Sequence, residues 1–219
     1  MIIGPSLDPL KTRCLPQSPC LNFPSSWIDW DTRLRESLHV SPDDHRFRIE
    51  ALRWLVENPA GIALMALVFM TVFWRCFEWP KVASLRRLLG GVLVVLAGAG
   101  MADLLSTGLK IYFGRLKPHV LYYNPRVLPA LSFPSNHAFN TAFLCVLFYI
   151  ASRGLRKKFP SGRRCFGVFL GILLLFIGSS RVVLGEHYPL DIVAGLVFGS
   201  LFAITYSSLV KLATSTKPW

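Results

Sequence analysis

One stretch of the chain combines a charge-free apolar run with a compact group of ionisable residues. Residues 180–210 read SRVVLGEHYPLDIVAGLVFGSLFAITYSSLV, and residues 192–210 carry no charge. An apolar run of this length is typical of a helix that crosses a membrane. Arg181, His187 and Asp191 lie at its edge, where ionisable groups are costly and usually mark a functional site. The stretch therefore predicts a membrane helix with a polar site at one end.

The composition of the whole chain also indicates a membrane protein. Hydrophobic residues make up 53% of it and charged residues only 16%, against about 25% charged residues in soluble proteins. Several uncharged runs are shorter than the ~20 residues that a crossing helix needs, but their flanks extend them. We therefore predict an all-α, polytopic membrane helix bundle of about five transmembrane helices, at residues 60–77, 88–109, 137–153, 165–182 and 190–210.

The ionisable group at the edge of the last run is arranged for histidine chemistry. Because proline is favoured at the first position of a helix, Pro189 is expected to begin this one. Asp191 then lies in the first turn and can reach back to His187, four residues earlier. A carboxylate that orients an imidazole makes the ring a better base or nucleophile. The alternative is that these residues and Arg181 only hold a helix end at the lipid surface.

Two earlier segments add the groups that phosphoryl transfer requires. Residues 110–118 read KIYFGRLKP and supply three cations beside a helix-breaking proline. Residues 134–137 read PSNH and supply a second histidine after two small polar residues. Cations that can hold phosphate oxygens, two histidines and a helix start together favour phosphoryl chemistry over a simple membrane anchor.

In their order and spacing, the three segments resemble the signature of the type-2 phosphatidic acid phosphatase family, whose relatives include glucose-6-phosphatase and the vanadium haloperoxidases. The family pattern is Lys, six residues, Arg-Pro; then Pro-Ser-Gly-His; then Ser-Arg, five residues, His, three residues, Asp. The third segment matches at every fixed position. Lys117 replaces the family's arginine, and lysine lacks the bidentate fork of a guanidinium. Asn136 replaces its glycine. Arg115 could compensate for Lys117, but we expect it to be a surface cation.

The resemblance implies a membrane lipid-phosphate or lipid-diphosphate phosphatase, of a bacterial membrane branch of the family. His187, oriented by Asp191, is expected to form a phosphohistidine, while His137 protonates the leaving oxygen and later activates water. No metal or other cofactor is expected. The residues expected to hold the phosphate oxygens are Lys110, Lys117, Ser135, Asn136 and Arg181.

Alternatives to this function use the same residues. A lipid phosphotransferase would pass the phosphate from the histidine to a second lipid, and a catalytically silent membrane scaffold would use the polar residues structurally. The sequence does not select the lipid. Undecaprenyl diphosphate, lipid A phosphates, phosphatidylglycerophosphate and phosphatidic acid are all candidates.

Charge predicts the orientation in the membrane. Five helices would place all three motifs on one face, and the opposite face is basic: residues 153–164 carry six Lys or Arg and no acid. By the positive-inside rule that face is cytoplasmic. The motif face would then be periplasmic at a bacterial inner membrane, or luminal in a eukaryote. The net charge of +12 thus reflects topology, and no binding to nucleic acid is expected.

Residues 1–57 are expected to form a region separate from the phosphatase domain at residues 58–219. The proline-rich residues 1–26 are expected to be irregular. Residues 27–39 and 45–57 mix aromatic and charged side chains, as do helices that lie on a membrane surface; a soluble helical pair over the external mouth is the alternative. Cys14 and Cys20 could form a disulfide in an oxidising compartment.

Overall fold

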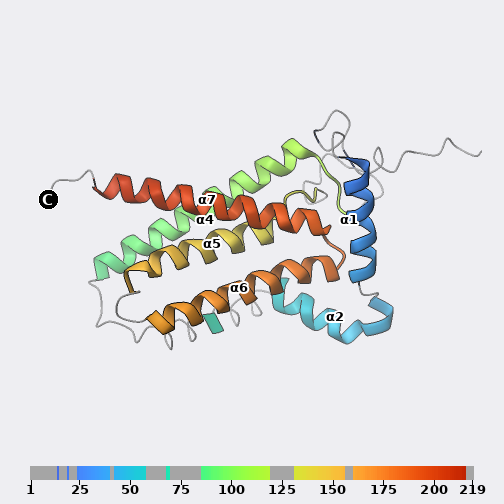
Figure 1. The fold of residues 1–219 in the computed structure, drawn as a ribbon, viewed down its shortest axis with the longest axis horizontal. Coiled ribbons are helices and arrows are strands. Elements are labelled where there is room, and N and C mark those ends of the chain that lie inside the picture. Colours follow the sequence, from blue (N-terminus) through green and yellow to red (C-terminus); the bar gives the residue numbers. More distant parts are fainter. Residues whose placement is uncertain are drawn as a thin grey trace, which may run out of the picture.

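The computed structural model describes residues 14, 19, 24–39, 42–57, 68–69, 85–118, 131–155 and 160–215. Helices α4 to α7 run along the long axis of the molecule, and α1 lies across one end of them (Figure 1). The helices, in chain order, are α1 (Ser25–Leu38), α2 (Pro42–Glu57), α4 (Leu85–Phe113), α5 (Asn136–Ala151), the short 3₁₀-helix η3 (Ser152–Leu155), α6 (Pro160–Val183) and α7 (Pro189–Ser215).

The predicted all-α membrane bundle is confirmed. Within the described residues, three helical segments are long and apolar enough to cross a membrane, namely Gly90–Phe113, Pro160–Val183 and Pro189–Ala213. The fourth apolar helix, α5, is shorter. These helices correspond to the predicted spans at 88–109, 137–153, 165–182 and 190–210. The first predicted span, 60–77, lies outside the described residues apart from Val68 and Phe69, which are helical.

Large apolar side chains cover the outside of the bundle. Leu104 on α4 is 75% exposed and Leu175 on α6 is 71% exposed. Continuous apolar surface of this kind is unfavourable in water and is typical of a surface that contacts lipid. The outward-facing apolar side chains therefore contact lipid, and the inward-facing side chains pack against the neighbouring helices.

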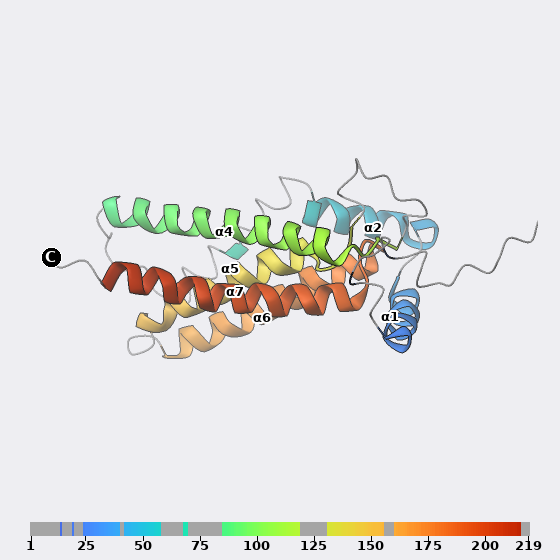
Figure 2. The same ribbon diagram turned by 90° about the horizontal axis from the view of Figure 1, so that it is seen from above.

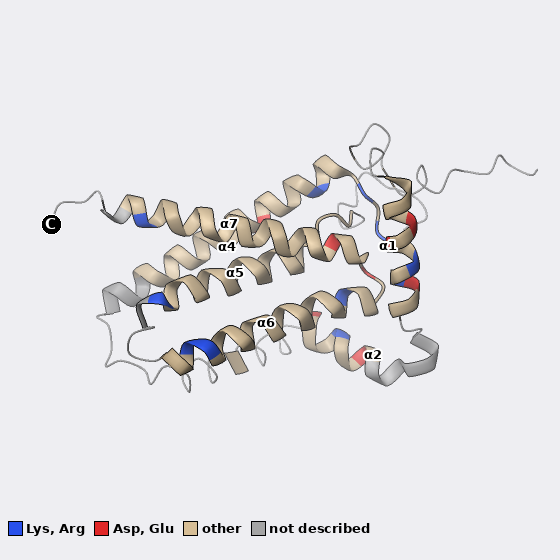
Figure 3. Cartoon of the chain, viewed as in Figure 1, with Lys and Arg blue, Asp and Glu red and all other residues tan. Residues whose placement is uncertain are grey.

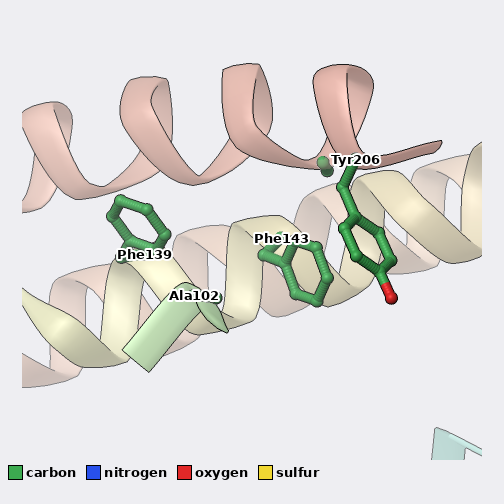
Figure 4. Packing of buried hydrophobic residues seen from close by; sticks show 5 residues of the cluster. Ala102, Phe139, Phe143 and Tyr206 are labelled. Carbon is green, nitrogen blue, oxygen red and sulfur yellow. The ribbon is translucent and has the colours of Figure 1, made fainter. Parts of the chain in front are cut away.

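The centre of the bundle is an aromatic cluster shared by α4, α5 and α7. Phe139 and Phe143 of α5 pack with Tyr206 of α7 and Ala102 of α4 (Figure 4). The ring centroids of Phe143 and Tyr206 lie 5.7 Å apart in an edge-to-face arrangement, which is a favoured geometry for aromatic pairs. The Tyr206 hydroxyl donates a 2.6 Å hydrogen bond to the Val94 carbonyl. This bond ties α7 to α4 and satisfies a polar group inside the apolar bundle.

Two glycines of α7 let its backbone approach α5 closely. A Cβ atom at Gly195 would lie 2.7 Å from the Ser135 carbonyl oxygen, and one at Gly199 would overlap the backbone of Phe139. Their four-residue spacing is the pattern found where membrane helices cross at short distance. The crossing brings the first turns of α5 and α7 together, and those turns carry two of the three predicted motifs.

Positive-φ glycines end two of the membrane helices beside the same site. Gly114 has φ 63° and directly follows α4, while Gly185 has φ 73° and lies just beyond α6. This conformation is strained for residues with a Cβ atom and is a common way to terminate a helix. The motifs lie at the ends of α4 and α6 and at the starts of α5 and α7. These four helix ends lie at the end of the bundle where α1 and α2 are found, as Figure 2 shows from above.

Charge separates the two ends of the bundle. In the coloured part of Figure 3, the end away from α1 and α2 carries Lys and Arg without acidic residues, and the opposite end carries both signs. The basic end includes Arg153 of η3, Arg163 of α6 and Lys211 of α7. The motifs and the basic cluster therefore lie at opposite ends of the membrane helices.

Candidate active site

The starts of α5 and α7 are joined at the centre of the site. The Ser135 N–H donates a 3.0 Å hydrogen bond to the Asp191 carbonyl, and the Ser135 carbonyl accepts a 2.9 Å bond from the Phe139 N–H. Ser135 and Asp191 are both fully buried. The backbone itself therefore fixes the PSNH segment against the segment that contains His187.

The carboxylate of Asp191 is held on both oxygens. Its Oδ1 accepts a 2.9 Å hydrogen bond from Nη1 of Arg115, and its Oδ2 accepts a 2.9 Å bond from the Tyr188 N–H. His187 Nδ1 lies 3.4 Å from the same Oδ2, which is close but long for a hydrogen bond. Since α7 begins at Pro189 as predicted, Asp191 reaches back to the imidazole from the first turn.

His187 is buried, and this burial determines its protonation. Loss of solvation lowers the pKa of His187 to about 4, an effect that Asp191 opposes and that Lys110 and Lys117 reinforce. The ring is therefore neutral at neutral pH and keeps a lone pair. Because Nδ1 faces Asp191, the remaining nitrogen, Nε2, is the one that can attack an electrophile.

The three predicted phosphate-binding cations each contact another part of the protein. Lys110 Nζ donates a 3.0 Å hydrogen bond to the Leu131 carbonyl. Lys117 Nζ lies 2.8 Å from Glu186 Oε2, and Arg181 Nη1 lies 2.7 Å from Glu57 Oε1. The two ion pairs place carboxylates on the cations that the sequence assigns to phosphate. An anionic ligand would have to share or displace them.

His137 lies in the first turn of α5, close to the charged residues of the site. It is exposed, in contrast to His187. It interacts electrostatically with Arg181, His187, Lys110 and Lys117. The first N–H groups of a helix also attract anions, and Asn136 is the first residue of α5. The structure thus brings all the predicted site residues together around one helix start.

Several buried polar atoms at this site have no hydrogen-bond partner among the described residues. Four of them belong to predicted site residues, namely Ser135 Oγ, Asn136 Oδ1, Arg181 Nε and His187 Nδ1, and a fifth is Arg115 Nε. Unsatisfied buried polar atoms are rare in proteins and are often explained by catalysis or by a ligand. Ser135 Oγ and Arg181 Nε, which can donate hydrogen bonds, are therefore available to an anionic substrate.

The expectation that Arg115 is a surface cation is wrong. Arg115 is only 1% exposed, and its guanidinium lies 2.6 Å from Asp31, 2.9 Å from Asp191 and 4.1 Å from the Tyr188 ring centroid. Burial alone would lower the pKa of Arg115, but Asp191 and Asp31 outweigh it and raise the pKa above its usual value. No local pattern marks this position, because one of the two carboxylates lies 84 residues away in the sequence.

Residues before position 58 contribute side chains to the site, which the family resemblance did not address. Asp31 of α1 is fully buried, and its Oδ1 accepts a 2.8 Å hydrogen bond from the Leu190 N–H at the start of α7. His39 Nδ1 lies 3.0 Å from the Val183 carbonyl oxygen at the end of α6. Cys14 forms an antiparallel β-bridge with Arg115. Together with Glu57 on Arg181, these contacts fasten the N-terminal region to the site.

The tryptophans of α1 are exposed next to the same site. Trp27 is 59% exposed and Trp30 is 52% exposed. With Leu190 they line an open pocket of about 250 Å³. Tryptophan is enriched at the boundary between lipid and water, so the exposed face of α1 has the composition of a membrane-interface surface.

Comparison with known proteins identifies the relatives of this chain. The sequence model of the PAP2 superfamily matches residues 90–215. Phosphatidylglycerophosphatase B of Bacillus subtilis is 31% identical over 120 residues, which are 53% of this chain and 56% of that protein. The chain thus spans little more than half the length of this relative. The undecaprenyl-diphosphatase of Sulfolobus acidocaldarius is 26% identical over 165 residues, 70% of this chain and 74% of that protein.

One solved structure shares the fold, and a second superposes less closely. The transmembrane PAP2-type phosphatidylglycerolphosphate phosphatase of Bacillus subtilis superposes with a TM-score of 0.60 at 18% identity, over 90% of each chain. Aquifex aeolicus LpxE superposes with a TM-score of 0.41 at 20% identity, over 73% of this chain and 93% of that one. The first similarity extends beyond residues 90–215 and therefore includes part of the N-terminal region.

Proposed function

The chain belongs to the PAP2 superfamily, and from this membership we propose that it is an integral membrane phosphatase of lipid phosphates or lipid diphosphates. The observation that carries the proposal is the buried, neutral His187 held against Asp191 beside Lys110, Lys117 and Arg181. A neutral imidazole next to a carboxylate and several cations can attack a phosphorus atom whose oxygens the cations neutralise.

The reaction has two steps that share the same histidines. In the first, Nε2 of His187 bonds to phosphorus while the bond from phosphorus to the leaving oxygen breaks, and His137 donates a proton to that oxygen. In the second, His137 takes a proton from water, the water oxygen bonds to phosphorus, and the bond from phosphorus to Nε2 breaks. The products are the dephosphorylated lipid, or the lipid monophosphate from a diphosphate, and inorganic phosphate.

The surrounding residues stabilise the charge on the phosphate oxygens. We assign this role to the side chains of Lys110, Lys117, Ser135 and Arg181 and to the first N–H groups of α5, at Asn136 and His137. The unpaired Ser135 Oγ and Arg181 Nε support the assignment. Since the cations of the chain neutralise the phosphate in this scheme, we expect activity to persist when divalent metal ions are chelated.

The class of substrate is supported by the relatives. One is named a phosphatidylglycerophosphatase and another an undecaprenyl-diphosphatase, so both act on the phosphate of a membrane lipid. The exposed tryptophans and the pocket beside Leu190 offer an apolar surface next to the site. Phosphatidylglycerophosphate, undecaprenyl diphosphate, phosphatidic acid and lipid A phosphates are the substrates to compare.

We place the active site on the external face of a bacterial inner membrane, facing the periplasm. The basic end of the bundle carries Arg153, Arg163 and Lys211, and basic residues favour the cytoplasmic side. At the opposite end, Cys14 lies beside Arg115 and is disulfide-bonded. Disulfides persist in oxidising compartments such as the periplasm, so both observations support the same orientation.

Phosphate release by the purified full-length protein tests the proposal. The wild type and His187→Ala are assayed in detergent with EDTA on the four lipids, after size-exclusion chromatography has established that both are folded. We expect release from at least one lipid by the wild type and none by His187→Ala. Brief incubation with ³²P-labelled substrate should label the wild type through an acid-labile, base-stable bond. Substantial turnover by folded His187→Ala would disprove the assigned chemistry.

A further inference from the structure

A buried chain of charges connects α1 to the proposed catalytic carboxylate. We propose that Asp31 and Arg115 are positioning residues, which fix the carboxylate of Asp191 so that it orients His187. Helix α1 then contributes one buried side chain, Asp31, that acts on the active site through Arg115. This inference rests on the proposed roles of His187 and Asp191 and adds two residues to them.

The geometry of Arg115 is that of a bridge. Its Nη2 donates a 2.6 Å hydrogen bond to Asp31 Oδ2, and its Nη1 donates a 2.9 Å bond to Asp191 Oδ1. All three side chains are at most 1% exposed. The guanidinium lies over the Tyr188 ring at 4.1 Å from its centroid. The planar guanidinium of Arg115 therefore fixes the positions of two carboxylates, from α1 and α7, relative to each other.

Stability alone is a weak reason for such an arrangement. Removing charges from water is costly, and buried ion pairs are often no more stabilising than apolar residues of similar volume. Here two buried carboxylates share one buried guanidinium, so their charges are not balanced one to one. Backbone contacts hold Asp31 and Arg115 in addition. The Leu190 N–H bonds to Asp31, and Arg115 pairs with the backbone of Cys14. A role in positioning explains why this arrangement is built around Asp191.

The bridge determines which oxygen of Asp191 faces the histidine. Arg115 occupies Oδ1, so Oδ2 is directed toward the Tyr188 N–H and His187 Nδ1. A fixed carboxylate holds the imidazole in the tautomer that carries the proton on Nδ1 and leaves Nε2 as the nucleophile. Without the bridge, the carboxylate would keep only its bond from the Tyr188 N–H. Its orientation would then be less restricted, and the His187 ring would be held in the productive tautomer in a smaller fraction of the molecules.

Direct binding of substrate by Arg115 is disfavoured by the same contacts. Both terminal nitrogens already bond to carboxylates, and the side chain is almost completely buried. Loss of the bridge should therefore slow the chemical step without weakening the binding of substrate. This separates a positioning role from a phosphate-binding role.

The test compares two acidic residues of α1. Asp31→Asn removes the buried charge with almost no change in volume, and Asp29→Asn removes an exposed charge from the same helix. For Asp31→Asn we expect kcat to fall by roughly 10- to 100-fold, the range seen when a residue that orients a metal-ligating histidine is lost, with KM within about twofold of the wild type. Asp29→Asn should keep the wild-type values of both constants.

A second variant covers the case in which Asp31→Asn does not fold. Arg115→Lys keeps the positive charge but cannot bridge two carboxylates, and we expect the same fall in kcat at unchanged KM. Wild-type kcat in either folded variant, with His187→Ala inactive, would overturn the positioning role and leave the proposed function intact. A rise in KM at unchanged kcat would overturn it too. An active His187→Ala would instead remove the proposed function and this inference together.

Discussion

Glu57 on α2 and Arg181 on α6 form an ion pair across 124 residues of sequence, with 2.7 Å between Oε1 and Nη1. Arg181 is buried, whereas the Glu57 side chain is 35% exposed and also lies 3.8 Å from Arg53. A carboxylate from the N-terminal region thus lies on a guanidinium that the proposed mechanism assigns to phosphate. Glu186 has the same relation to Lys117. In the proposed mechanism, substrate and these carboxylates therefore compete for the same cations.

The first prediction is that Glu57→Gln tightens the binding of substrate. The amide keeps the size of the side chain but removes the charge that competes with phosphate. Because partly exposed ion pairs contribute up to about 1 kcal/mol, we expect KM to fall by roughly two- to fivefold at unchanged kcat. Glu50→Gln, an exposed position on the same helix, is the control and should leave KM unchanged. An unchanged or higher KM for Glu57→Gln would show that the carboxylate does not compete with substrate.

The second prediction concerns pH. Burial lowers the pKa of His187 from 6.5 to about 4 in the folded protein. Between these two pH values the unfolded chain binds a proton at this residue and the folded chain does not. The free energy of unfolding should therefore decrease as the pH falls from 6.5 toward 4.

Thermal unfolding in detergent checks this prediction. The stability of the wild type relative to His187→Gln should decrease through this pH window and be constant above it, because glutamine does not titrate. A difference between the two proteins that is independent of pH would mean that the pKa of His187 is not lowered.

The third prediction concerns the crossing of α5 and α7. In Gly195→Ala the added methyl would lie 2.7 Å from the Ser135 carbonyl oxygen and 2.9 Å from the Ala138 Cβ atom, so one helix must move. We expect a loss of about 1–3 kcal/mol in stability and a lower kcat, because the start of α5 shifts relative to His187. Gly100→Ala on α4 has nothing within 4 Å and should be neutral or slightly stabilising. Equal effects of the two substitutions on the melting temperature and on kcat would contradict a close crossing.

The fourth prediction concerns orientation in the membrane. Ser37 lies on the exposed surface of α1 and Ser161 in the first turn of α6, at opposite ends of the bundle. In a background without the native cysteines, a membrane-impermeant thiol reagent applied to intact cells should label Ser37→Cys and spare Ser161→Cys. Lysed cells provide the control in which both react. The reverse pattern would place the site in the cytoplasm.

Local properties of the sequence determined the helices and the spacing of the motifs. Hydropathy predicted the spans at 88–109, 165–182 and 190–210 within a few residues of the observed helices, because a helix in lipid must satisfy its own backbone and expose apolar side chains. The start of α7 at Pro189 and the reach of Asp191 to His187 follow from helix geometry over four residues. Such relations depend only on neighbours in the chain.

Only the tertiary structure decided how the site is held together. Arg115 resembled a surface cation because its partners, Asp31 and Asp191, lie 84 and 76 residues away. The spacing of Gly195 and Gly199 is visible in the sequence, but which helix they contact is not. Pairing between distant charges and close contact between helices depend on how whole elements pack, and no local periodicity encodes that choice. The same holds for the N-terminal helices, whose Asp31 and Glu57 reach the site only because α1 and α2 dock at the end of the bundle.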